Sequence, residues 1–73
     1  MEDRIPCVVF AYNGFYVNMY ADDNFWAYEV IVDDTLLIAD DYLSRERMSV
    51  GVLIEMIMAR IDDMNMINQR YLN

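Results

Sequence analysis

The chain has 73 residues, with 13 acidic side chains against 5 basic ones, so its formal net charge is −8. Apolar residues make up 58% of it, more than the roughly half of an average soluble domain, which argues against intrinsic disorder. A domain usually needs about 50 residues or more, so residues 1–73 are expected to form one domain. Phosphate binding needs clustered basic residues, so direct nucleic-acid binding is disfavoured.

A domain of this size has few means of stabilising itself alone. The single cysteine, Cys7, cannot form an internal disulfide, and a chain without histidine has no standard zinc site. A core this small rarely provides more than about 3–5 kcal/mol, so we expect a homodimer that buries more surface. The lone cysteine, the acidic start of the chain and the lack of about 20 consecutive apolar residues predict a cytoplasmic protein without a membrane span.

The first predicted elements are two strands, over residues 5–12 and 15–21, which flank Asn13-Gly14. Asn-Gly between β-rich runs predicts a type I′ hairpin turn, because both central residues of that turn need a positive φ. With a two-residue turn, the numbers of facing residues add up to 27, so Tyr12 faces Phe15. One face of this hairpin is then apolar or aromatic, and it carries Val8, Phe10, Tyr12, Phe15, Val17 and Met19.

A third strand is predicted over residues 25–32, after a turn around Asp22-Asp23-Asn24. If this is a two-residue turn at Asp23-Asn24, facing numbers add up to 47 and Trp26, Tyr28 and Val30 join the apolar face; the alternative, a bulged three-residue loop, would change this register. A further turn follows at Asp33-Asp34. Residues 35–39 are a short fourth strand or, alternatively, the start of a helix capped by Asp34, because so short a run is ambiguous.

Residues 45–72 are predicted to form one amphipathic helix, capped by Ser44 or Ser49. Its apolar stripe follows the 3.6-residue period and comprises Val50, Leu53, Ile54, Ile57, Ile61, Met64, Ile67 and Tyr71. The expected fold is therefore α+β: an antiparallel meander of three to four strands within residues 5–39, with the helix packed on the sheet. A strand of eight residues is shorter than this helix, so the helix is expected to extend past the sheet.

The residue types do not favour an enzyme. A chain without histidine cannot hold a His-based catalytic triad, and one without lysine cannot form a Schiff base. Thr35, Ser44 and Ser49 are better explained as turn or cap residues, and Cys7 has no basic neighbour that would activate it. The sequence also lacks a glycine-rich phosphate loop, so we expect neither enzymatic activity nor a cofactor.

Paired aspartates are the most distinctive polar feature, at Asp22-Asp23, Asp33-Asp34, Asp40-Asp41 and Asp62-Asp63. If the first three pairs are turns, the first and third lie together at one end of the meander. Aspartate is a common turn residue and keeps surfaces soluble, and the spacing of a calcium loop is absent. The alternative is an anionic surface that binds a basic partner. Its predicted acidic residues are Asp22, Asp23, Glu29, Asp33, Asp34, Asp40 and Asp41.

Two further groups of side chains are candidates for contacts with a partner. Tyr16 and Tyr20 are predicted on the mixed face of the sheet beside carboxylates, where they suit arginine-rich partners, although tyrosine is also an ordinary strand residue. Several apolar residues flank the main stripe of the helix and form a predicted oligomer seam of Val52, Met56, Met58 and Met66.

Two hypotheses of function remain. The first is a non-enzymatic inhibitor or decoy that blocks a basic site on a nucleic-acid-handling protein. In size, charge and lack of catalytic residues the chain is similar in type to small acidic inhibitors of phages and mobile elements, such as anti-CRISPR and other DNA-mimic proteins; a phage protein of this kind would act in the host bacterial cytoplasm. The second is a structural or regulatory module that acts through its methionine-rich helix. Added salt should weaken only the first kind of binding.

Overall fold

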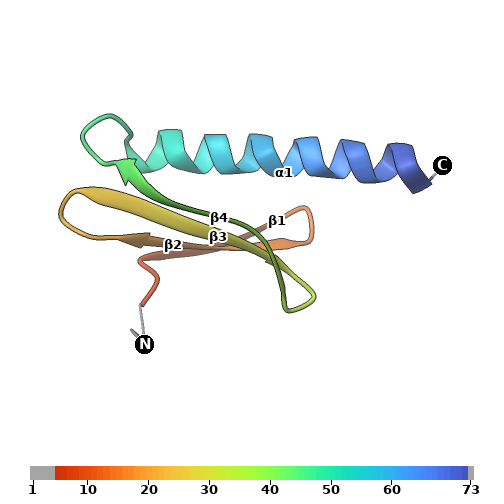
Figure 1. Ribbon diagram of the computed structural model, residues 1–73, viewed down its shortest axis with the longest axis horizontal. Coiled ribbons are helices and arrows are strands. Elements are labelled where there is room, and N and C mark those ends of the chain that lie inside the picture. Colours follow the sequence, from red (N-terminus) through yellow and green to blue (C-terminus); the bar gives the residue numbers. More distant parts are fainter. Residues whose placement is uncertain (1–4, 73) are drawn as a thin grey trace.

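The computed structural model describes the backbone of residues 5–72 and the side chains of residues 5–66. Four strands, β1 (Val8–Tyr12), β2 (Phe15–Ala21), β3 (Phe25–Val32) and β4 (Thr35–Ser44), precede one helix, α1 (Val50–Leu72). The strands form one antiparallel sheet in the order β1-β2-β3-β4. The helix runs along one face of this sheet and its last turns extend past it (Figure 1). The predicted α+β meander with a C-terminal helix is confirmed.

The first three strands pair as the sequence predicts. Tyr12 faces Phe15 across the first turn, and Ala21 faces Trp26 across the second. Asn13 and Gly14 have φ values of 51° and 83°, the left-handed conformation that a type I′ turn requires. Because side chains alternate along each strand, these registers place the predicted apolar set of the three strands on the helix-facing side, whereas Val9 and Ile31 lie on the other face.

The fourth strand is longer and less regular than expected. Thr35–Ser44 is a strand throughout, which settles the open alternative of a helix at residues 35–39. Its pairing with β3 slips by one residue twice, once at Leu37 and once between Asp40 and Leu43. The expectation that Asp40-Asp41 forms a turn at the end of the sheet is wrong, because both residues belong to β4 and Asp40 pairs with Tyr28 in mid-sheet.

The helix begins at Val50, five residues later than the predicted boundary. Residues 45–47 form a turn after β4, and Ser49 caps the helix: its Oγ accepts a hydrogen bond of 3.2 Å from the backbone N–H of Val52. The connection is fixed to the sheet by Trp26, whose indole Nε1 donates a 2.9 Å hydrogen bond to the carbonyl of Met48. At 1.5 Å per residue, the helix is about 35 Å long.

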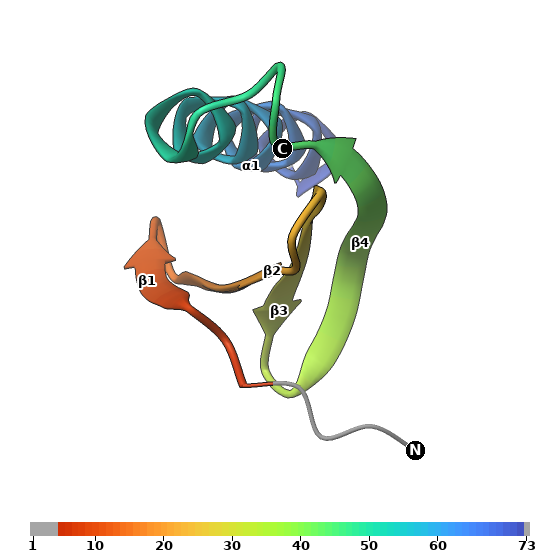
Figure 2. The ribbon, with the colours of Figure 1, turned by 90° about the vertical axis from the view of Figure 1, so that its left-hand side faces the viewer.

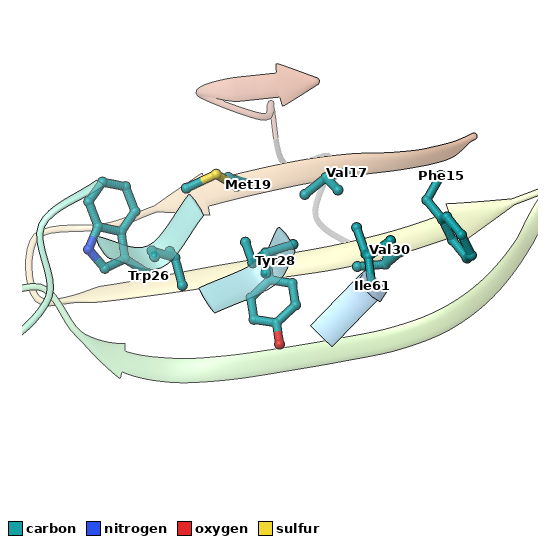
Figure 3. Close-up of a cluster of buried hydrophobic side chains, with 9 residues drawn as sticks. Phe15, Val17, Met19, Trp26, Tyr28, Val30 and Ile61 are labelled. Carbon is teal, nitrogen blue, oxygen red and sulfur yellow. The ribbon is translucent and has the colours of Figure 1, made fainter. Parts of the chain in front are cut away.

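The core lies between the sheet and α1. The sheet curves so that β1 and β4 stand at its two sides and α1 lies along the concave side (Figure 2). The buried side chains of β2 and β3 point towards this side (Figure 3), where they meet fully buried residues of the helix. The core consists of Phe15, Val17, Met19, Trp26, Tyr28, Val30, Leu53, Ile57 and Ile61. Within the described residues, no helix is long and apolar enough to cross a membrane.

Candidate interaction surface

Asp40 is turned towards the helix and takes part in a polar cluster with Tyr28 and Arg60. The hydroxyl of Tyr28 donates a 2.5 Å hydrogen bond to Oδ2 of Asp40. The Arg60 guanidinium donates to the same oxygen and also, over 2.7 Å, to the hydroxyl of Tyr28. The cluster therefore ties β3 and β4 to α1 from one side of the helix.

The environment of Tyr28 also changes its acidity. Burial raises the pKa of its hydroxyl from 10.0 to about 12, and the hydrogen bond to Asp40 and the negative charge of that carboxylate act in the same direction. A phenol placed in this way keeps its proton and stays a donor. The cluster is thus a structural contact, and Asp40 is much less available to a partner than a turn residue would be.

Asp62 makes a second polar cluster on the opposite side of the helix. Its Oδ2 accepts a 3.0 Å hydrogen bond from the hydroxyl of Tyr12, and its Oδ1 accepts one of 3.1 Å from Nδ2 of Asn13. The hydrogen bond to Asp62 raises the pKa of Tyr12 above its ordinary value. Because Arg60 and Asp62 are the neighbours of the fully buried Ile61, the helix is held on both flanks of that core residue.

Two further predicted acidic residues are engaged in the sheet. The Oδ1 atom of Asp22 accepts hydrogen bonds of 2.8 Å and 2.7 Å from the backbone N–H groups of Asn24 and Phe25, which holds the β2–β3 turn. The hydroxyl of Tyr20 donates a 2.6 Å hydrogen bond to Oε1 of Glu29. These carboxylates lie at the surface, but each is directed to a partner within the fold.

The carboxylates of Asp23, Asp33 and Asp34 differ from these. All three residues are exposed, and none of their carboxylates has a hydrogen bond or an ion pair with another described residue. We call them the tip acids, because they stand in the two turns at the ends of β3. Asp41 is exposed as well, but it has interactions within the fold. The predicted group of Asp22, Asp23, Asp40 and Asp41 at one end of the sheet is therefore not formed, because Asp40 and Asp41 lie within β4.

The residues predicted to make aromatic and apolar contacts with a partner also differ in how exposed they are. Tyr16 is 59% exposed on the face of the sheet opposite the helix. On the helix, Val52 and Met66 are 51% and 55% exposed, whereas Met58 is half-buried and Met56 packs against the core. Only two of the four residues of the predicted seam are therefore well exposed.

The contacts that sequence reasoning missed are those that fix the helix and its connection. Arg60 and Asp62 flank a residue of the apolar stripe, and that position at the border of the stripe is the signal that could have identified them. Arg45 was also missed: its guanidinium lies 4.9 Å from the centre of the Trp26 ring, and it donates to the carbonyl of Asp22. No sequence pattern pairs this arginine with a tryptophan on another strand.

The described residues contain no group of three or more His, Cys, Asp or Glu side chains that could hold a metal ion. Comparison of the chain with protein-family models, with curated proteins and with solved structures finds no significant match. The interpretation of its function therefore rests on the arrangement of its own side chains.

Proposed function

We propose that this chain is a non-enzymatic acidic binding protein, a decoy that occupies a basic site on a nucleic-acid-handling protein in a bacterial cytoplasm. The observation that supports it is the separation of the acidic residues into two groups. Asp22, Asp40 and Asp62 are used to hold the fold together. The tip acids Asp23, Asp33 and Asp34 have no such use, and their charge is left for a partner.

Neither Arg45 nor Arg60 forms an ion pair with a tip acid. Arg60 is paired with Asp40, and Arg45 is held between the Trp26 ring and the carbonyl of Asp22, where it lines the same surface hollow as Asp23. The charge of Asp33 and Asp34, at the other end of β3, is not balanced by either of these basic groups. A cationic surface is attracted electrostatically to such charges, and this attraction weakens as salt is added.

The spacing of the tip acids fits an extended basic site. The eight residues of β3 separate the β2–β3 turn from the β3–β4 turn, which is about 27 Å at 3.4 Å per residue. The phosphates of one strand of a duplex repeat every 3.4 Å or so along the axis, so the two turns span about eight base pairs. A groove that binds a short stretch of duplex could therefore contact both turns at once.

The alternative function is an oligomerisation or adaptor module that acts through α1. The exposed Val52 and Met66 favour it. However, Asp63 lies between them on the same stripe of the helix, which repeats at intervals of four and three residues. Two copies of this stripe would bring like charges into the seam, so we give the decoy preference.

The test is capture of proteins from bacterial lysate by the tagged chain, with Asp23, Asp33 and Asp34 replaced together by asparagine. The decoy predicts capture of a nucleic-acid-binding protein that is released by salt and displaced by duplex DNA. Capture should be lost in the variant, because the charge that the partner meets has been removed.

The control replaces Glu55 and Asp63 of α1 by Gln and Asn. Both residues are exposed, so the control removes negative charge from the helix and leaves both turns at the ends of β3 unchanged; Glu46 is kept because it lines the same surface hollow as Asp23. The control should keep most of the capture. Equal capture by all three proteins, or capture that resists salt and DNA, would contradict the decoy and favour the adaptor.

A further inference from the structure

The two edges of the sheet are protected to very different degrees. The β4 edge is interrupted by its two register slips, and Tyr42 within it has a φ of 61°. Such bulges prevent another strand from pairing along an edge. The β1 edge has neither a slip nor a charged residue over Val8–Tyr12, and within residues 5–72 no strand pairs with it.

The register shows which backbone groups of β1 are left without a partner strand. In a two-residue hairpin the pair that flanks the turn, here Tyr12 and Phe15, is hydrogen-bonded, and such pairs alternate along the strands. Phe10 and Val8 are therefore also bonded to β2. The N–H and C=O groups of Val9 and Ala11 face outwards, so they form a short template for one more strand.

The side chains of β1 favour an apolar neighbour. Val8, Phe10 and Tyr12 are only half-buried although they pack against the core, and Val9 on the other face is 62% exposed. A basic partner would find no opposite charge on this strand. A second copy of the same strand would meet it without contact between like charges, despite a net charge of −8 on each chain.

We propose that β1 pairs with β1 of a second copy, antiparallel and with Phe10 at the two-fold axis. This register pairs Val9 with Ala11 of the second copy and the reverse, so all outward-facing groups of both strands are used. Val8 then stands beside Tyr12 of the second copy on the helix-facing side, and the two sheets become one sheet of eight strands. The proposal is independent of the decoy function, and β3, which carries the tip acids at its ends, lies two strands away from this interface.

The first test is sedimentation velocity over a micromolar to millimolar range of protein. The native chain should show a monomer–dimer equilibrium. Replacing both Val9 and Ala11 by glutamate puts like charges opposite each other twice, so the dimer should weaken about tenfold or more. Both positions are exposed, so circular dichroism should show an unchanged fold.

The matched control replaces Val52 and Met66 by glutamate, which adds the same charge to the exposed side of the helix. This variant should dimerise like the native chain. A chain that stays monomeric over the whole range, or a dimer lost in the helix variant and kept in the β1 variant, would overturn the proposal.

A second test measures the geometry of the dimer with a spin label on Cys7, which is exposed and is the single cysteine of the chain. Cys7 stands three residues from Phe10, so the two labelled Cα atoms should lie roughly 20 Å apart along the paired strands. A dimer through the outer side of α1 would place them on opposite outer sides of the assembly, at a much longer distance. Such a long distance would also contradict the proposal.

Discussion

The β1–β2 and β3–β4 hairpins have the same kind of turn but very different strands. Both turns have two residues with positive φ, Asn13-Gly14 in one and Asp33-Asp34 in the other. The first hairpin keeps one register along its whole length and carries no charge in its strands, whereas the second slips twice and carries aspartates. Turn chemistry alone therefore does not determine how regular a hairpin is.

The irregular pairing of β4 determines which of its side chains lie on each face of the sheet. Leu36 faces Ile31 on the side of the sheet away from the helix, whereas Ile38 faces Val30 and Asp40 faces Tyr28 on the helix side. In a regular strand Leu36, Ile38 and Asp40 would all lie on the same face, because they are two residues apart. Leu36 lies on the opposite face from the other two because Leu37 is the extra residue of a bulge. Without that bulge Asp40 would point away from Arg60, and the polar cluster could not form.

The largest expected effect comes from replacing Ile61 of α1, which belongs to the core against which both hairpins pack. Ile61→Ala removes a fully buried side chain between the two polar clusters of the helix. We expect the free energy of unfolding to fall by about 3 kcal/mol, measured by urea denaturation. A loss well below this value would mean that the helix is not the element that joins the hairpins.

The next effect distinguishes the hairpins directly. Tyr28→Phe keeps the ring but removes the hydroxyl that contacts Asp40 and Arg60, so it should cost about 1 kcal/mol of unfolding free energy. Tyr12→Phe is the matched change in the first hairpin, and it should cost clearly less because its contact with Asp62 is exposed. Equal losses in urea denaturation would contradict the difference drawn between the two clusters.

Substitutions in the Asn13-Gly14 and Asp33-Asp34 turns should change the stability of the fold in opposite directions. Gly14→Ala should cost about 1 kcal/mol: an added Cβ meets no atom within 4 Å there, but φ at +83° is strained for alanine. Asp34→Gly relieves a φ of 61° and should stabilise the chain by about 0.5 kcal/mol. Thermal unfolding of both variants checks the signs, and a destabilised Asp34→Gly would show that this aspartate has a structural contact.

The last effect is a dependence on high pH. The pKa of Tyr28 is raised to about 12 in the folded chain from 10.0 for an unperturbed tyrosine. The protonated hydroxyl therefore stabilises the fold fully below pH 10, and this contribution is lost as the pH rises through about 12. Absorbance titration of tyrosinate should show a late-titrating group that is missing in Tyr28→Phe.

The sequence predicts the regular part of the molecule well. Asn13-Gly14 and the alternation of apolar residues correctly determine the register of three strands, and the 3.6-residue period identifies the helix. Both signals are local, because a turn type and a side-chain period depend on neighbouring residues alone. The contact of Glu29 with Tyr20 on the mixed face also agrees with the predicted register.

The irregular part could not be predicted from such local signals. Leu36, Leu37 and Ile38 are all apolar, so alternation does not show which of them faces the helix. Asp40-Asp41 has the composition of a turn, yet Asp40 is held by Arg60, which is 20 residues further along the chain. Whether an aspartate serves the fold or a partner depends on such distant contacts.

We propose that only some of the acidic residues are available to a basic partner. The most direct measurement is an NMR titration of the ¹⁵N-labelled chain with a short arginine-rich peptide, at low and at high salt. We expect salt-sensitive shift changes at Asp23, Asp33 and Asp34, with little change at Asp40 and Asp62. Changes that are as large at Asp40 and Asp62 as in the two turns would contradict it.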